Sequence, residues 1–123
     1  MFNLSEVVST LFKARNVAHE LHLKSKSFAE HLALEELYDS LLPLTDDFAE
    51  SYQGTYGIST QSYEEFNKQF SMNAYSFIVE LLDYVTATKL LIVSSNLGSQ
   101  LENIFDEIIA TVSKTKYKIE NLK

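Results

Sequence analysis

The residues best suited to chemistry lie in the first half of the chain, where all three histidines fall within thirteen residues. They are His19, His22 and His31, and His31 is followed by the carboxylates of Glu35, Asp46 and Glu50. His31 and Glu35 (the first pair) are four residues apart, as are Asp46 and Glu50 (the second pair), so on a helix each pair projects from one face. Imidazole and carboxylate groups are common ligands of iron, zinc and manganese. This spacing therefore indicates a metal site.

Each of these features also has a plainer interpretation. A histidine on an apolar helix face is more often a hydrogen-bonded core residue than a ligand, and this is the interpretation we favour for His22. A single pair of charged residues is more often a solvated face. However, Glu35 and Asp46 are only about 20° apart around a helix axis. Both pairs would flank a leucine stripe, where a carboxylate is costly to bury without a cation or hydrogen bonds.

The two pairs are too far apart to bind one ion within a single chain. Their midpoints are separated by fifteen residues, which is ~22 Å along a helix axis. A second, antiparallel copy of the helix solves this problem if a twofold axis passes near Ser40 and Leu41. The first pair of one subunit then faces the second pair of its partner, and His19 adds a third ligand. We expect Leu42 and Tyr38 to fill the seam between the two copies.

The elements that position these residues are predicted to be helices, because the chain has only three glycines and one proline. Apolar periodicity predicts helices over about 4–24, 27–52 and 72–95, and a fourth from Ser99. A short helix is expected near Ser62 within a long connection over 53–71. Two hairpins joined by one long crossover make a single domain over 1–123, with the all-α fold of a ferritin-like four-helix bundle. The predicted core positions are Leu4, Val7, Val8, Leu11, Phe12, Ala18, Leu34, Leu37, Leu41, Leu44, Phe48, Tyr75, Ile78, Val79, Leu82, Val85, Leu90, Val93, Leu101, Ile104, Phe105, Ile108, Val112 and Ile119.

Helix ends and breaks can also be read from the sequence. Asn3 is a suitable N-cap, and Ser27 with Glu30 forms a capping-box sequence, as does the segment that starts at Ser99. Pro43 falls inside the second predicted helix and cannot donate a backbone hydrogen bond, so we expect a kink there. The alternative is a helix that stops at Leu42 and restarts.

Composition and charge exclude several classes of function. The chain has no cysteine, which removes disulfide scaffolds and thiolate chemistry, and no apolar run of membrane-spanning length. Its net charge of -7 disfavours nucleic-acid binding, apart from a weak contribution from the C-terminal lysines, and suits a protein that attracts metal cations. The N-terminal residues lack the features of a signal peptide, so we expect a soluble, cytoplasmic protein.

The intervals between the five candidate ligands resemble those of the Dps proteins, or mini-ferritins. The intersubunit ferroxidase site of that family has the pattern His-x11-His-x3-Asp-x10-Asp-x3-Glu. His19, His31, Glu35, Asp46 and Glu50 reproduce every interval, with Glu35 in place of an Asp. The resemblance implies that these residues bind iron and oxidise Fe(II) with peroxide or dioxygen, in a protein that sequesters iron and protects against oxidative stress. It also implies twofold dimers assembled into a twelve-subunit shell.

The chain departs from the Dps pattern in ways that fit a divergent member of the family, for instance one encoded by a phage. Glu20 follows His19 where the family usually has Trp, the chain contains no Trp, and it lacks a lysine-rich N-terminal extension. Zinc or manganese could occupy the same site without redox chemistry, and His22 or Asp47 could join it. The alternative function is a non-enzymatic helical oligomer that acts as a structural or interaction module.

Overall fold

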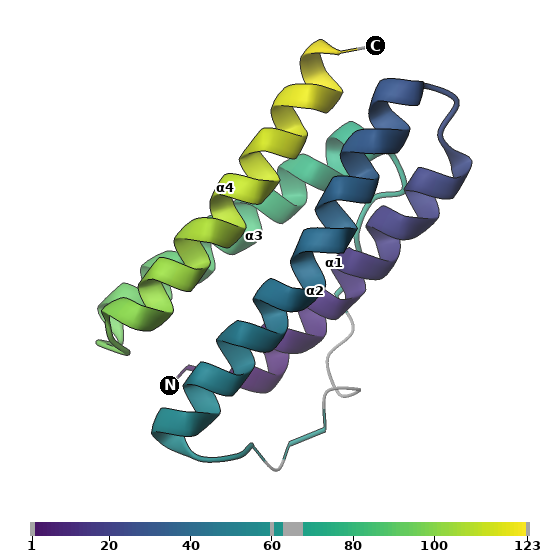
Figure 1. The fold of residues 1–123 in the computed structure, drawn as a ribbon. Coiled ribbons are helices and arrows are strands. Elements are labelled where there is room, and N and C mark those ends of the chain that lie inside the picture. The colour runs from purple at the N-terminus through teal and green to yellow at the C-terminus, as the bar shows by residue number, and fades with distance from the viewer. Residues whose placement is uncertain (1, 60, 63–67, 123) are drawn as a thin grey trace.

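The structure is a computed structural model that describes residues 2–59, 61–62 and 68–122. It contains α1 (Leu4–Lys24), α2 (Phe28–Tyr56), α3 (Ala74–Ser94) and α4 (Ser99–Asn121), and no strand within those residues (Figure 1). The predicted all-α class and the four long helices are therefore confirmed. The short helix expected just after Ser62 falls on residues outside the described ranges. None of the helices in the described part is both long and apolar enough to cross a membrane.

The four helices form two antiparallel hairpins, α1–α2 and α3–α4, with α2 packed against both α1 and α4 (Figure 1). Helices α2 and α3 begin at the same end of the molecule. A pocket of about 300 Å³ at that end is lined by Ser27 before α2, Asn73 before α3 and Leu122 after α4. At the opposite end, the hydroxyl of Tyr56 donates to the carbonyl oxygen of Leu97 in the α3–α4 turn, at 2.9 Å. The end of α2 and the start of α3 therefore lie at opposite ends of the molecule.

Side-chain caps explain where three of the helices begin. Asn3, Ser27 and Asn73 each accept a hydrogen bond from the backbone N–H three residues further on, at 3.1, 3.3 and 3.0 Å. The predicted cap of the fourth helix is wrong, because Ser99 is already inside α4. Its N-cap is Gly98, which makes no side-chain bond and has a φ of 115°. Glycine adopts this left-handed conformation without the steric cost of a Cβ atom.

Helix α2 runs through Pro43 without interruption and ends four residues later than predicted, at Tyr56 rather than Tyr52. The alternative of a helix that stops at Leu42 is therefore wrong. Buried side chains lie on both sides of the proline, since Leu41 and Phe48 are each 0% exposed. Their burial offsets the backbone hydrogen bond that proline cannot donate. The kink stays a prediction.

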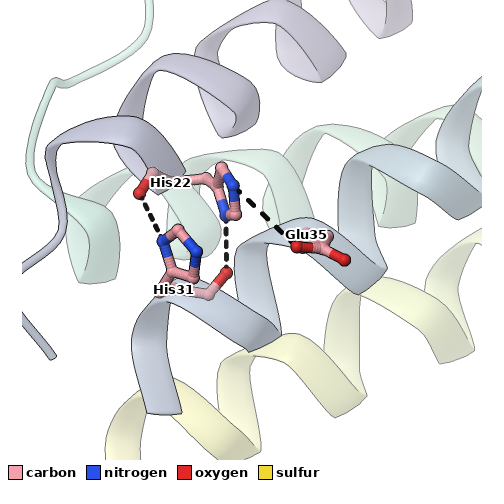
Figure 2. A group of neighbouring side chains, drawn as sticks. All are labelled: His22, His31 and Glu35. Carbon is pink, nitrogen blue, oxygen red and sulfur yellow. Dashed lines mark hydrogen bonds and ion pairs between the residues drawn. The ribbon is translucent and has the colours of Figure 1, made fainter. Parts of the chain in front are cut away.

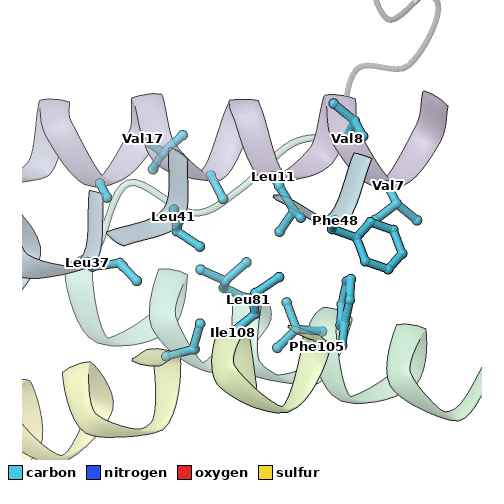
Figure 3. Packing of buried hydrophobic residues seen from close by; sticks show 14 of the residues in the cluster. Val7, Val8, Leu11, Val17, Leu37, Leu41, Phe48, Leu81, Phe105 and Ile108 are labelled. Atoms are coloured by element: carbon cyan, nitrogen blue, oxygen red, sulfur yellow. The ribbon is translucent and has the colours of Figure 1, made fainter. Parts of the chain in front are cut away.

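The core joins all four helices and includes the aromatic rings of Phe48 and Phe105 (Figure 3). The ring of Phe48 in α2 lies edge-on to Phe105 in α4, with centroids 4.9 Å apart, and to Phe2 before α1 at 6.0 Å. Most of the core positions predicted for α1, α2 and α4 are buried, whereas Phe12, Leu44 and Ile119 are partly buried at its edge. The leucine stripe of α2 is thus confirmed as a core face.

The predicted inward face of the third helix is partly wrong. Leu90 and Val93 are 66% and 44% exposed, and Tyr75 is exposed as well. Phe77 and Leu81 are instead fully buried, as is Ile92; none of these three was among the predicted core positions. Apolar residues occur almost all round α3, so helical periodicity alone does not define which face points inward.

Candidate metal site

The turn between α1 and α2 brings two histidines into direct contact (Figure 2). His22 lies in the last turn of α1 and His31 in the first turn of α2. Their rings are stacked, with centroids 3.7 Å apart and planes inclined by 21°. Nδ1 of His22 lies 2.8 Å from the carbonyl oxygen of His31, and Nδ1 of His31 lies 2.9 Å from the carbonyl oxygen of His22. The two residues therefore bond each other's backbone reciprocally.

These reciprocal bonds determine which ring nitrogen carries the proton. A carbonyl oxygen can only accept a hydrogen bond, so Nδ1 of each histidine must be the donor. In a neutral ring, Nε2 is then left with a free lone pair. Metal-binding histidines typically have this arrangement, in which one nitrogen donates to a carbonyl group and the other faces the ion. Nε2 is thus the nitrogen of His22 and of His31 that is free to bind a metal ion.

Glu35 adds a carboxylate one helical turn after His31, and its Oε1 lies 3.9 Å from Nε2 of His22. One ligand atom from each of His22, His31 and Glu35 lies within 4.8 Å of the other two. We refer to these three residues as the triad. The side chain of His22 is 8% exposed and that of Glu35 is 44% exposed, so solvent reaches the site from the Glu35 side. A free Nε2 lone pair and a carboxylate repel each other, and a proton or a metal ion between them removes that repulsion.

The donor set of the triad fits a transition metal. Two imidazoles and one carboxylate are the ligands of many non-haem Fe(II) centres, which keep further coordination positions open. Metal–nitrogen bonds of about 2.0–2.1 Å are shorter than the spacing in the triad allows without movement. The exposed carboxylate of Glu35 has the freedom to move inward. The chemistry of the ligands thus fits, and binding requires the ligands to move from these positions.

Of the five predicted ligands, the structure brings His31 and Glu35 together and places His22, rather than His19, beside them. His19 instead stacks on the ring of Tyr38, with centroids 4.2 Å apart and planes inclined by 16°. A signal for His22 was present in the sequence. Across a short turn in a helical hairpin, residues equally distant from the turn lie opposite each other, and the turn at 25–27 is nearly midway between His22 and His31. Whether His19 binds a metal stays a prediction.

The second predicted pair, Asp46 and Glu50, lies further along α2, and both residues are exposed. Eleven residues, or roughly 16 Å of helix, separate Asp46 from Glu35, so these carboxylates do not reach the triad of their own chain. Leu41, near which a twofold axis was expected, is buried in the core, whereas Leu42 is 43% exposed. Approach of the second pair from another subunit stays a prediction.

The aromatic ring of Tyr38 borders the triad. It lies edge-on to His22, with centroids 5.3 Å apart and planes inclined by 79°. Burial raises the pKa of the Tyr38 phenol above its ordinary value, and the carboxylates of Glu35 and Asp39 raise it further. The phenol therefore stays protonated and neutral at neutral pH. It covers the His22 side of the site with an apolar surface.

Helix α2 carries the whole net charge of the chain. It has no lysine or arginine. Its acidic residues are Glu30, Glu35, Glu36, Asp39, Asp46, Asp47 and Glu50. These seven account for the net charge of -7, because the other ten acidic residues are balanced by ten lysines and arginines. One of the seven, Glu36, is paired with Lys118 of α4. Helix α2, which contributes His31 and Glu35, thus has a net negative charge that favours cations.

The chain belongs to a family of unknown function (DUF5856), whose model matches residues 22–119. The matched residues include the whole triad and also Asp46 and Glu50, and they leave out His19. No curated protein and no solved structure matches the chain.

Proposed function

We propose that this member of the family binds Fe(II) through His22, His31 and Glu35 and oxidises it. The observation that carries the proposal is the pair of reciprocal Nδ1–carbonyl bonds, which leaves Nε2 of both histidines free beside a carboxylate. Such a ligand set binds Fe(II) and leaves positions for an oxidant. Zinc or manganese fits the same ligands without redox chemistry.

The proposed activity is a Dps-like ferroxidase in a ferritin-like fold. The connectivity supports it, because α2 and α3 begin at one end of the molecule, as a long crossover requires. In the full proposal, a partner subunit related by a twofold axis contributes Asp46 and Glu50, and such dimers build a shell that stores iron. The exposed positions of these two carboxylates and of Leu42 are compatible with that contact.

The proposed chemistry needs few groups from the protein. Two Fe(II) ions give up one electron each, and one hydrogen peroxide takes both electrons and two protons to become two waters. The Glu35 carboxylate stabilises the harder Fe(III) product more than an imidazole does. The negative charge of α2 raises the local concentration of Fe(II) near the triad.

A non-enzymatic interaction module is the second candidate, and the surface around the α1–α2 turn favours it. Leu23 and Phe28 are 71% and 74% exposed, and Leu32 is 40% exposed. In this case the triad holds a proton or a structural ion that keeps the hairpin closed, and the apolar side chains contact another protein. Iron oxidation distinguishes the two candidates.

The ferroxidase proposal predicts that wild-type protein loaded with Fe(II) without oxygen oxidises it rapidly when peroxide is added. The rise in near-ultraviolet absorbance follows the reaction. His31→Ala removes one ligand of the triad and should abolish the rapid phase, whereas Glu102→Gln, in the first turn of α4, should leave it unchanged. Wild-type oxidation no faster than in buffer would instead support the interaction module.

The intersubunit part of the proposal predicts that Asp46→Ala is also inactive, and that a mixture of the two inactive variants regains activity. In a mixed dimer, one site contains both substitutions and the other contains none. Dissociation and reassociation of a His31→Ala and Asp46→Ala mixture should therefore restore part of the oxidation rate. An Asp46→Ala variant as active as wild type would show that the triad of one chain is sufficient.

A further inference from the structure

The stacked arrangement of His22 and His31 is not yet the arrangement that binds an ion. The lone pair of Nε2 lies in the plane of its ring, so a bound ion must lie close to both ring planes. The two planes are nearly parallel and the ring centroids are 3.7 Å apart. An ion midway between them would lie about 1.8 Å out of each plane, almost as far as a whole metal–nitrogen bond of about 2.1 Å. One ion cannot be aligned with both lone pairs while the rings are stacked.

We infer that the stacked pair is the closed form of the metal site, and that an ion binds only after the two rings turn out of the stack. This inference rests on the proposed metal-binding function and adds a regulatory step to it. Each ring keeps its Nδ1–H in the open form, because a histidine that binds through Nε2 retains the proton on its other nitrogen. The closed form is held by the reciprocal Nδ1–carbonyl bonds, by ring stacking and by the short turn between the helices.

The turn at 25–27 restrains how far the two histidines can separate. The hydroxyl of Ser25 donates to the carbonyl oxygen of Ser27 at 3.0 Å and accepts from the backbone N–H of Ser27 at 3.2 Å. These bonds take the place of the carboxylate half of the predicted capping box, since the Ser27 N–H faces Ser25 rather than Glu30. Removing the Ser25 hydroxyl should loosen the turn without changing any ligand of the triad.

A site that must open before it binds has a distinct kinetic signature. When opening is slower than binding, the observed rate rises with metal concentration and then reaches a plateau set by the opening step. Only the open fraction of molecules binds, so the apparent affinity is reduced by that fraction. Loosening the turn should therefore raise the plateau rate and the affinity together.

Stopped-flow binding of Co(II), followed by its visible absorption, tests this signature. We expect a plateau for the wild-type protein and a plateau about fivefold higher for Ser25→Ala, the factor that corresponds to a hydrogen bond worth about 1 kcal/mol. Ser94→Ala is the matched control, because its hydroxyl bonds the carbonyl oxygen of Leu91 at the opposite end of the molecule. A rate that rises linearly with Co(II), or equal effects of the two serine variants, would overturn the inference.

Imidazole NMR with Zn(II) gives a second readout that does not depend on rates. In the metal-free protein, both rings should be in the Nδ1–H form, with ring protons shifted upfield by stacking. Zinc should remove the upfield shifts and leave both Nδ1–H groups in place. If zinc binds while the upfield shifts remain, the inferred opening of the stack is wrong and the proposed metal site stands. If neither Zn(II) nor Co(II) binds, the proposed metal site is wrong as well.

Discussion

The His22→Ala variant is expected to bind Zn(II) at least about 100-fold more weakly than the wild-type protein. The substitution removes one of two nitrogen ligands, which costs more than the 10–100-fold that loss of an outer-shell partner costs. It also removes the ring that stacks on His31 and the Nδ1–H that donates to the His31 carbonyl group. Titration calorimetry with Zn(II) at neutral pH measures the change directly.

The matched control is His19→Ala, three residues earlier on the same helix. His19 stacks on Tyr38 and lies edge-on to His22, with ring centroids 5.9 Å apart, but it contributes no ligand atom to the triad. This variant should therefore bind Zn(II) within a few-fold of the wild type. The Dps resemblance makes the opposite prediction, because it assigns a ligand role to His19 and none to His22. Loss of binding in His19→Ala with full binding in His22→Ala would favour the Dps ligand set and contradict the triad.

The Phe48→Ala variant is expected to lose about 3–5 kcal/mol of its free energy of unfolding. The Phe48 side chain is fully buried and joins α2 to Phe105 of α4 and to Phe2, so its removal leaves a cavity between elements that cannot easily close. A loss of this size is a large share of the 5–15 kcal/mol that stabilises a typical domain. Urea denaturation followed by circular dichroism measures it.

Phe28→Ala provides the comparison for that experiment, because it removes the same side chain from a position that is 74% exposed. Its free energy of unfolding should stay within about 0.5 kcal/mol of the wild type. Equal destabilisation by the two substitutions would show that Phe48 does not occupy the centre of the core. It would also remove the basis for placing the α1–α2 hairpin against α4.

The sequence predicts the helices well because their ends and faces are encoded locally. Asn3 and Ser27 cap helices where expected, and the leucine stripe of α2 is buried. The face of α3 could not be predicted in the same way, since apolar residues occur on almost every side of this helix and do not single out one inner face. Tertiary contacts decide there that Phe77 is buried and Leu90 is exposed.

The candidate site depends on how α1 and α2 pack across the turn that joins them. The spacing of candidate ligands along the sequence does not specify this packing. The chain spacing correctly groups His31 with Glu35, because four residues make one helical turn. The choice between His19 and His22 depends on how tightly α1 and α2 are joined, and the three-residue turn at 25–27 favours the histidine nearer to it. A contribution of Asp46 from a partner subunit depends on how the subunits assemble, and the sequence of one chain does not specify that.

The central claim is that His22, His31 and Glu35 hold one metal ion. X-ray absorption spectroscopy of the protein loaded with one equivalent of Zn(II) tests this claim most directly, because imidazole rings give a characteristic outer-shell scattering pattern. We predict two imidazole nitrogens and oxygen ligands at about 2.0–2.1 Å. An ion surrounded by oxygen atoms alone, with no imidazole scattering, would contradict the account.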